Sequence, residues 1–488
     1  MIDQRPPRLA WGMWKRFLLC GVTVVVLTAA ATATAALLQV KQFADTVFTP
    51  QNRLHFGSDL IGDPGGPETF LIIGSDKRAK STATQDRLSP PHSDTMMLVR
   101  MDPNRGQTSL LSIPRDLQVT IDGPNGPSVQ KINAAYSIGG SRLALRTVKR
   151  VLHISVNHVV DVNFAGFRAA VTAVGCVYVD VDHRYFNQNV GTSATNFSSI
   201  NLQPGYQRLC GDQALSYVRF RHTDSDFIRV ARQQDFIRQF KAQVGVQGLL
   251  DHASQLERVG GRSIQTDIHG TTAALKILKL IAFSLSRPVR QVPFRAFPGP
   301  SYVTATPDDI SRTVRDFLSG SGQPRAPAPR VAVHRGRGRA AATRTLGLVA
   351  STSSGRNLAI GASRRLPFPV YYPRLMIGMG SEQGVRRYTL RDEQGHRHHA
   401  YRIVFSQGLI GDYYGVEGTD WTNPPLLTTP STRQTIGGRT YELFYDGSHL
   451  RWVAWRTPHA VYWVSNTLVD SLSQRQMLAI AESTAPVR

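Results

Sequence analysis

The chain has 488 residues, enough for two or three domains, and 41% of them are hydrophobic, which excludes a chain that lacks a packed core. Its formal net charge of +23 at pH 7 favours an anionic partner. Nucleic acid, an anionic membrane surface and a phosphate-bearing substrate all fit that charge, and composition alone does not choose among them.

An uncharged apolar run, FLLCGVTVVVLTAAATATAALLQV, extends from Phe17 to Val40. About 24 residues are enough to cross a hydrocarbon layer of roughly 30 Å. Positive charge is concentrated before the run, which predicts a cytoplasmic tail over 1–16, a membrane anchor over 17–40 and an extracytoplasmic remainder. The alternative is a cleaved signal peptide, because small residues near Ala29–Ala36 offer a cleavage site. Either reading exports the bulk of the chain, so chromosomal DNA is not an expected partner.

After a polar juxtamembrane linker over 41–66, strand and helix patterns alternate. Short apolar, β-branched runs bounded by turn residues predict buried strands at TFLIIGSD, TMMLVRMD, TSLLSIPRD, HVVDVNF and CVYVDVD. Helical patterns follow at Ser141–Leu152 (after a Gly-Gly start), Phe164–Val174, Gly211–Phe220, Val230–Val244, Leu275–Ser286 and Pro307–Leu318. This alternation predicts an α/β layered domain over 67–320.

Residues 321–345 are rich in Gly, Pro, Ala and Arg, which predicts a flexible basic linker. It either touches anionic wall polymer or lipid, or is only a solvated spacer. A small α+β domain is predicted over 346–488, from aromatic-rich strands, an Asp446-Gly447 hairpin turn and a final helix at QMLAIAES. Its aromatic residues fit either a sugar-stacking face or the core and cross-strand pairs of a sheet. We find no convincing catalytic cluster there.

The sequence contains three cysteines, of which Cys20 lies inside the apolar run. Cys176 and Cys210 lie in the exported part, where disulfides persist, and they allow only one intrachain pairing there. We predict that they are bonded to each other. Two free buried thiols are the alternative.

Charged residues concentrate where the predicted strands end, at Asp76, Asp94, Arg115 and Lys131, and in the run VRFRHTDSDFIRVARQQ. Ligands of open α/β sheets bind beyond the strand ends. Two carboxylates with several guanidinium groups suit Mg²⁺ bound to a phosphate ester, because Mg²⁺ needs few protein ligands and arginine forks hold phosphate oxygens. The alternative is that these charges are solvated or form surface pairs.

The motifs themselves add to this reading. FLIIGSDKR, HSDTMMLVRMDP, LLSIPRDLQV, KINAAYSIGG, VDVNFAGF and LCGDQALSYVRFRHTDSDFIRVARQQ, in this order, resemble the LytR-CpsA-Psr family from about Thr69 to Lys241, with weaker continuation to Leu318. The resemblance implies a central mixed β-sheet flanked by helices, with an appended C-terminal domain. It also implies an Mg²⁺-dependent phosphotransferase of cell wall assembly. Such an enzyme moves a glycan phosphate from a polyprenyl-pyrophosphate carrier to peptidoglycan, at the outer face of the cell membrane.

Carried over by position, Asp76 and Asp94 resemble the magnesium ligands of the family. The residues that resemble its pyrophosphate-binding set are Arg115, Lys131, Arg219, Arg221, Arg229 and Gln233. Of these ligands, Asp76, Asp94, Arg115, Arg219 and Arg221 are expected to act in catalysis. The chain departs from the family at His92, where an arginine is usual, and Arg78 and Arg87 are nearby candidates to replace its charge.

The implied reaction is phosphoryl transfer, in which metal and arginines stabilise the departing polyprenyl phosphate while a sugar hydroxyl attacks. Asp224 and Asp226 are candidates to accept the hydroxyl proton. The lipid tail needs an apolar tunnel, for which the candidates are Leu143, Leu145, Val171 and Val174, unless these are ordinary core residues.

Three rival functions remain open to different degrees. Hydrolysis of the same pyrophosphate differs only in the acceptor, so sequence does not separate it from transfer. A non-catalytic regulator or wall-binding scaffold would keep its function without Asp76 and Asp94. A DNA-binding regulator is disfavoured, because no helix-turn-helix pattern stands beside the apolar run.

Overall fold

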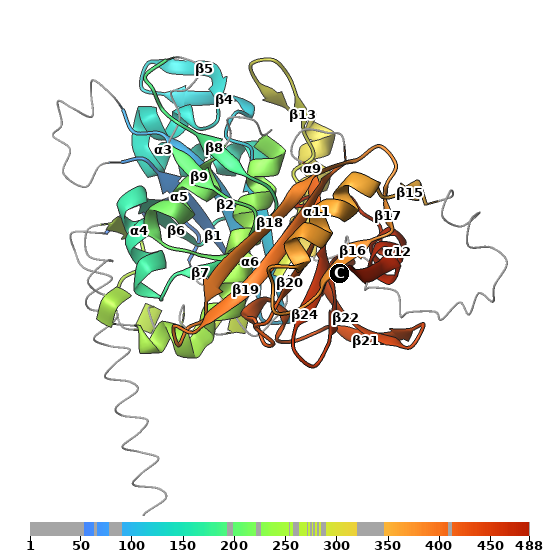
Figure 1. Cartoon of the computed structure of the whole chain (residues 1–488). Helices are drawn as coiled ribbons and strands as arrows, with labels where there is room; N and C mark the ends of the chain where they lie inside the picture. Colours follow the sequence, from blue (N-terminus) through green and yellow to red (C-terminus); the bar gives the residue numbers. More distant parts are fainter. Residues whose placement is uncertain are drawn as a thin grey trace, which may run out of the picture.

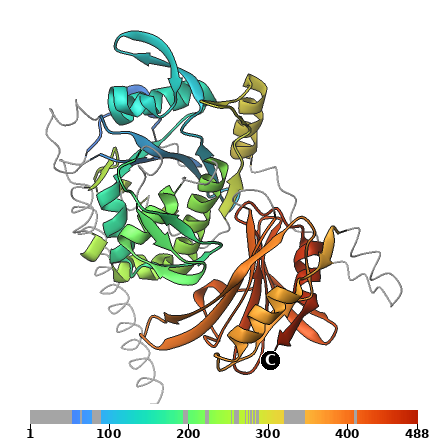
Figure 2. The same cartoon turned by 45° about the horizontal axis from the view of Figure 1, so that its top comes forward.

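The computed structural model describes residues 53–62, 66–77, 90–192, 199–220, 226–252, 254–256, 263–270, 272–273, 276, 279–280, 283–284, 289–319, 346–407 and 412–487. The predicted tail, anchor and linker over 321–345 lie outside these residues, as does most of the predicted helix over 275–286. Within the described ranges, no helix is both long and apolar enough to cross a membrane. The domain boundaries stay predictions. We call the described residues from 53 to 319 the first part and those from 346 to 487 the second part. In Figures 1 and 2 the first part is coloured blue to yellow and the second part orange to red.

A six-stranded mixed sheet forms the centre of the first part, in the order β11-β6-β1-β2-β3-β12. Its strands are β1 (Glu68–Ser75), β2 (Ser93–Asp102), β3 (Gln107–Ile113), β6 (His158–Asn163), β11 (Ile264–Thr266) and β12 (Val289–Val292). The β1/β2, β2/β3 and β6/β11 pairs are antiparallel, and the β1/β6 and β3/β12 pairs are parallel. The predicted mixed sheet is therefore confirmed.

Helices cover both faces of this sheet. They are α3 (Ala134–Leu152), α4 (Phe164–Ala173), α5 (Gly211–Arg219), α6 (Asp226–Asp251) and α9 (Pro307–Ser319). Side chains alternate across a strand, so Leu71 faces a core shared with Leu145 of α3, while Phe70 faces the cluster that includes Ile237 of α6. Both strand faces are buried, which explains why the strands read as nearly continuous apolar runs.

Gly139 and Gly140 divide α3 into two helical segments, because both have non-helical backbone angles and Gly140 takes φ 63°. The helix predicted over Ser141–Leu152 is therefore present, and a segment that begins at Ala134 and was not predicted precedes it. Leu145 and Val171, predicted as candidates for one lipid tunnel, are buried in two different hydrophobic clusters. Their role in a tunnel stays a prediction.

Smaller strand pairs surround the sheet, and most were not predicted. They are β4 (Gln118–Gly123) with β5 (Gly126–Lys131), β7 (Val177–Val181) with β10 (Gly205–Leu209), β8 (Tyr185–Asn187) with β9 (Ile200–Leu202), and β13 (Phe297–Pro298) with β14 (Val303–Thr304). Of these, β7 and β10 pair antiparallel and lead through Cys210 directly into α5.

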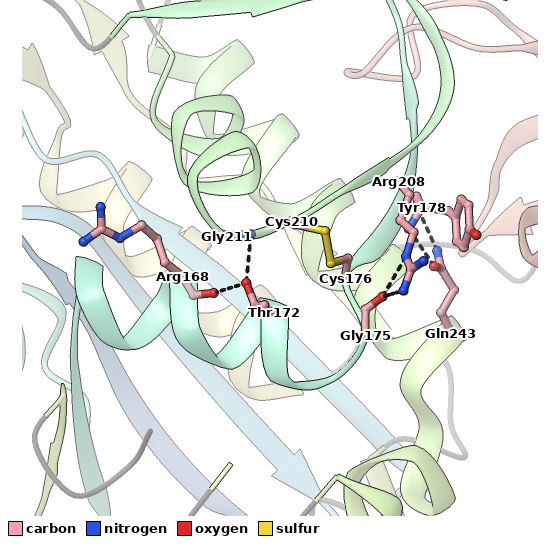
Figure 3. The surroundings of a disulfide bond; sticks show 9 residues. All are labelled: Arg168, Thr172, Gly175, Cys176, Tyr178, Arg208, Cys210, Gly211 and Gln243. Carbon is pink, nitrogen blue, oxygen red and sulfur yellow. Dashed lines mark hydrogen bonds between the residues drawn. A yellow bond between two sulfur atoms is a disulfide. The ribbon is translucent and has the colours of Figure 1, made fainter. Parts of the chain in front are cut away.

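The predicted Cys176–Cys210 disulfide is present, with the two Cα atoms 4.6 Å apart (Figure 3). It joins the turn after α4 to the residue that precedes α5. Nearby, the Gly211 amide donates to Thr172 Oγ1 at 3.3 Å, and Arg208 Nε donates to the Gly175 carbonyl at 2.8 Å. The start of α5 is thus fixed against α4 by a covalent bond and by hydrogen bonds.

The second part contains a seven-stranded antiparallel sheet in the order β18-β19-β20-β24-β23-β22-β21. Its strands are β18 (Ser381–Arg391), β19 (Arg397–Ser406), β20 (Tyr413–Thr419), β21 (Thr432–Ile436), β22 (Arg439–Asp446), β23 (His449–Arg456) and β24 (Val461–Ser465). Two helices pack on it, α11 (Ser353–Ser363) and α12 (Gln474–Ser483). Short pairs flank it, β15 (Leu348–Ala350) with β17 (Leu375–Ile377) and β16 (Val370–Pro373) with β25 (Thr484–Val487).

The predicted hairpin at Asp446-Gly447 connects β22 and β23, and Gly447 takes φ 59°, a left-handed value that glycine adopts without strain. Trp455, Trp463 and Tyr462 are at most 1% exposed. For these three side chains the core reading is therefore correct, and a sugar-stacking role is not.

Candidate functional site

Strand pairing brings the predicted site residues to one edge of the central sheet. Because β2 runs antiparallel to both β1 and β3, the start of β2 lies beside the ends of β1 and β3. Asp76 follows β1, Asp94 is the second residue of β2, and Arg115 comes two residues after β3. Since β6 is parallel to β1, its end also reaches this edge and leads into Phe164.

Asp94 is the centre of the charged cluster. Its Oδ1 accepts from Arg115 Nη1 at 2.6 Å, and its Oδ2 lies 2.9 Å from Arg219 Nη2 and 3.1 Å from Arg219 Nε. The three side chains are 15–30% exposed, so solvent reaches them only in part. Two guanidinium groups share one carboxylate, which leaves the trio with an excess positive charge. The cluster is therefore suited to an additional anion.

Arg219 comes from the last turn of α5, and its guanidinium lies over the Phe164 ring, 3.9 Å from the centroid. An aromatic face attracts a cation and limits the rotamers of a long side chain. Sequence reasoning did not identify Phe164. Its position directly after β6, at the same edge of the sheet, was the available signal.

Lys131 reaches the cluster through Asp116. Asp116 Oδ1 lies 2.9 Å from Lys131 Nζ, and Asp116 Oδ2 lies 3.7 Å from Arg115 Nε. Within the described part of the chain, Arg115 Nε is buried and makes no hydrogen bond. Arg115 Nε faces Asp116, so Arg115 attracts a ligand by the charge of its guanidinium and not through this nitrogen.

Asp76 lies beside the start of β2. Its backbone N–H donates to the His92 carbonyl at 3.1 Å, and its Oδ1 accepts from the His92 N–H at 2.6 Å. The β1–β2 register shifts between Gly74 and Ser75. The residue at the family's usual arginine position therefore contacts Asp76 through its backbone.

Gln233 connects α6 to both arms of the cluster. Its Nε2 donates to Thr95 Oγ1 and to the Val218 carbonyl, both at 3.1 Å. Arg229 is buried one turn earlier on the same side of α6. Arg221 and Asp224 lie outside the described residues, as does the side chain of Asp226.

The carboxylates present fit a metal that arrives with phosphate oxygens. In the described ranges, no group of three or more His, Cys, Asp or Glu side chains is arranged to hold a metal ion. Asp76 follows β1, and Asp94 lies at the start of the adjacent strand β2. Mg²⁺ requires only one or two carboxylates when substrate phosphates complete its shell. The arrangement therefore does not make a dedicated protein cage for a metal.

A buried carboxylate stabilises the edge of the sheet that carries the charged cluster. Asp161 of β6 is 3% exposed and accepts from Ser75 Oγ at 2.9 Å, Tyr136 OH at 2.6 Å and Ser141 Oγ at 2.8 Å. Burial and the nearby Asp161 carboxylate raise the pKa of Tyr136. The Tyr136 hydroxyl therefore stays protonated and donates its hydrogen bond. These bonds tie the end of β1 to both halves of the broken α3. Sequence reasoning missed this group.

A pocket of about 480 Å³ opens next to the edge. Lys77 and Pro91 line it, and they are the chain neighbours of Asp76 and His92. Its wall also includes Tyr136, Arg142 and Gln265 together with Leu54 and Phe56, so its lining combines polar and apolar side chains.

A family model and several relatives of known name match this chain. The model of the LytR_cpsA_psr family matches residues 24–306. The chain is 35% identical to the polyisoprenyl-teichoic acid–peptidoglycan teichoic acid transferase TagU of Enterococcus faecalis, over 35% of this chain and 52% of the relative. It is 31% identical to the corresponding transferase TagV of Bacillus subtilis, over 45% and 54%. The chain thus spans about half the length of the curated relatives it matches. The crystal structure of B. subtilis TagV aligns with 25% identity and a TM-score of 0.41, covering 52% of this chain and 98% of that one.

Proposed function

The chain belongs to the LytR_cpsA_psr family, and on this premise we propose that it transfers a glycopolymer phosphate from a polyprenyl-pyrophosphate carrier to peptidoglycan. The observation that carries the proposal is the convergence of Arg115 and Arg219 on Asp94 at the sheet edge. The two transferases named above, which act between polyisoprenyl-teichoic acid and peptidoglycan by their names, support the same substrate classes.

The arginines would bind the pyrophosphate oxygens. A planar guanidinium offers several donors in a fixed geometry that matches a phosphate, and the Arg115 and Arg219 side chains are both partly exposed at the cluster. During transfer the acceptor hydroxyl oxygen bonds to the phosphorus that carries the glycan, and the bond from that phosphorus to polyprenyl phosphate breaks. The hydroxyl proton passes to a general base, for which Asp224 and Asp226 are the candidates. Arg115 and Arg219 then stabilise the charge on the departing phosphate.

Asp76 and Asp94 would hold Mg²⁺. When bound, the ion would neutralise charge on the pyrophosphate. Each carboxylate oxygen has more than one acceptor site, so Asp94 can contact a cation while it keeps hydrogen bonds to the arginines. The His92 backbone N–H donates to Asp76 Oδ1 and orients this carboxylate, so no side-chain donor is needed for that purpose.

We place the site outside the cytoplasm, on a chain whose N-terminus is cytoplasmic and whose residues 17–40 anchor it in the membrane. The Cys176–Cys210 disulfide supports this location, because such bonds persist in oxidising compartments.

The pocket beside Lys77 and Pro91 offers room for part of a large donor. Its volume of about 480 Å³ is far larger than a water molecule needs, and its lining combines apolar and polar side chains, as a lipid-linked saccharide requires. Transfer and hydrolysis both need this room, so the products of the reaction distinguish the two.

The test uses the purified full chain, a defined lipid-linked saccharide and peptidoglycan fragments. We expect a glycosyl-phosphate adduct on the fragment by mass spectrometry, formed much more slowly by Arg115→Lys and Arg219→Lys. Arg312→Lys is the control, since Arg312 is half-exposed on α9 and pairs with acids on its own helix. Release of polyprenyl phosphate without an adduct would instead show hydrolysis and overturn the proposal.

A further inference from the structure

A buried charge cluster joins the second part of the chain to the helix that carries Gln233. Arg451 of β23 lies 2.9 Å from Asp235 of α6 and 2.7 Å from Asp470. The Arg451 and Asp235 side chains are 5% and 2% exposed. On the same helix Arg238 contacts Asp446, at the end of β22.

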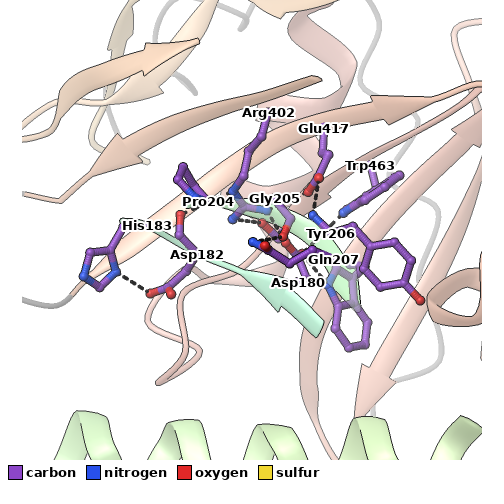
Figure 4. A network of polar contacts seen from close by, with 12 residues as sticks. Asp180, Asp182, His183, Pro204, Gly205, Tyr206, Gln207, Arg402, Glu417 and Trp463 are labelled. Atoms are coloured by element: carbon purple, nitrogen blue, oxygen red, sulfur yellow. Dashed lines mark hydrogen bonds and ion pairs between the residues drawn. The ribbon is translucent and has the colours of Figure 1, made fainter. Parts of the chain in front are cut away.

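A second buried network holds the neighbouring strands β7 and β10 (Figure 4). Arg402 of β19 pairs with Asp180 of β7, and it also contacts Glu417 Oε2 at 2.7 Å. The backbone N–H of Tyr206, in β10, donates to Glu417 Oε1 at 2.7 Å. The same Asp180 carboxylate accepts from the Trp463 indole at 3.4 Å. These groups are buried, so the two parts meet in one defined arrangement.

The energetics make this arrangement specific. Buried charges tolerate few alternative arrangements, because a displaced charge would lose its compensating partners. Asp235 also lies 2.9 Å from Arg238, and Arg451 also pairs with Asp470, so the two residues belong to one connected set of ion pairs. Asp235 and Arg451 therefore hold α6 in one position relative to the second sheet. The helix is also bound at its other end, where the Gln243 side chain accepts from the Tyr178 N–H at 2.8 Å and donates to its carbonyl at 2.7 Å.

From Asp235 the connection to the candidate site is two residues long. Gln233 donates to Thr95 Oγ1 and to the Val218 carbonyl, and Gln234 donates to Ser112 Oγ at 3.1 Å. Thr95 follows Asp94 in β2, and Val218 precedes Arg219 in α5. The position of α6 therefore sets the separation between the strand that carries Asp94 and the helix that carries Arg219.

We propose that Asp235 and Arg451 are a positioning pair, through which the second part of the chain fixes α6 and thereby the geometry of the Asp94–Arg219 cluster. This inference rests on the proposed function for its consequence in catalysis. Neither residue contacts the cluster itself, so both act through Gln233. The second part is then a brace for the site, and removing its contact with α6 loosens the site without unfolding the second sheet.

The experiment compares Arg451→Met and Asp235→Asn in the full chain. Asp235→Asn is the milder variant, because it keeps the size of the side chain. It removes the charge attraction to Arg451 and Arg238, and it leaves Arg451 paired with Asp470 and Arg238 paired with Asp446. Arg451→Lys tests rescue by a conserved charge. The matched control is Arg439→Met, since Arg439 packs over Tyr371 and Trp455 and bonds Thr484, all within the second part.

We expect kcat for transfer to fall about tenfold to a hundredfold in Arg451→Met and Asp235→Asn, as for a misplaced site, with partial recovery in Arg451→Lys. Arg439→Met should keep the wild-type kcat. Amide hydrogen exchange should accelerate at Thr95 and over Val218–Phe220 in the two α6-contact variants while β22 and β23 stay protected.

The exchange measurement separates this inference from the proposed function. If the wild-type chain transfers no glycan, the function proposal fails, and accelerated exchange at Thr95 still supports the positioning pair. If folded Asp235→Asn keeps both the wild-type kcat and wild-type exchange at Thr95 and Val218, the positioning pair is wrong.

Discussion

Arg219 and Asp94 are 125 residues apart in the chain, and both Nε and Nη2 of the arginine approach the same carboxylate oxygen, at 3.1 and 2.9 Å. This contact joins the end of α5 to the start of β2. It holds the Arg219 guanidinium beside an anion, and like-charge repulsion with Arg115 is offset by the shared carboxylate. The consequences for ligand binding are open to direct test.

Replacing Arg219 by Lys keeps the charge but removes the planar set of donors. One ammonium group replaces the guanidinium donors at the carboxylate, and stacking over Phe164 is weakened. We expect turnover to fall roughly tenfold to a hundredfold, the equivalent of one charged hydrogen bond of about 1.5–3 kcal/mol. Steady-state transfer and calorimetric binding of geranyl pyrophosphate measure the effect. Wild-type values for both would remove Arg219 from the site.

Asp94→Asn should abolish metal-dependent turnover while the fold remains. Asp94 lies at a strand end outside the hydrophobic clusters, so the fold should persist, and the loss of its charged hydrogen bonds should lower the unfolding free energy by about 1.5–3 kcal/mol. Turnover is measured across a magnesium titration and after chelation, with Asp308→Asn on the exposed face of α9 as the control. Magnesium-dependent turnover in Asp94→Asn would contradict the proposed role.

The disulfide should contribute to stability. Cys176 and Cys210 are 34 residues apart, and closing a loop of that size is worth about 3–4 kcal/mol in the chain-entropy model. The Cys176→Ser/Cys210→Ser chain should therefore unfold at lower denaturant concentration than the oxidised chain. Adding reductant should lower the midpoint of the wild type and leave that of the variant unchanged. Equal midpoints for the oxidised wild type and the variant would count against the bond.

The charge bias around residues 17–40 predicts the membrane topology of the chain. With the N-terminus inside, a reporter fused after Arg488 should be active only if it works outside the cytoplasm. Alkaline phosphatase should report activity, and a cytoplasm-dependent fluorescent reporter should not. The reverse pattern would overturn the location proposed for the whole chain.

Sequence reasoning placed Asp94 and Arg115 together because strand ends of one sheet meet at an edge, and local patterns identified the strands. Arg219 ends a helix, and the family resemblance assigned it to the same site. The helix start after Gly139–Gly140 was predicted, but the helical segment before this pair was not. That segment depends on the packing of Ala135 and Tyr136 in the core, which local periodicity does not record.

Other features depend on pairs that are distant in the chain. Asp235 and Arg451 are 216 residues apart, and each reads alone as one charge among many. Asp161 lies in an ordinary strand pattern, and its hydroxyl donors come from β1 and from both halves of α3. Sequence patterns record local periodicity, so they do not reveal which distant polar groups will share a buried position.

The buried network around Glu417 should make stability depend on pH. Burial, and next the neighbouring Asp180 carboxylate, raise the pKa of Glu417 from 4.5 to about 8 in the folded chain. Below pH 4.5 both folded and unfolded states carry the proton, and its contribution to stability is complete. Between 4.5 and about 8 only the folded state keeps it, so the unfolding free energy should fall by about 1.4 kcal/mol per pH unit. Glu417→Gln removes this term. Urea titrations at several pH values measure the unfolding free energy of both chains. As pH rises, the value for the wild type should fall relative to the value for Glu417→Gln. A difference that stays constant from pH 5 to pH 8 would show that Glu417 has the same charge in both states.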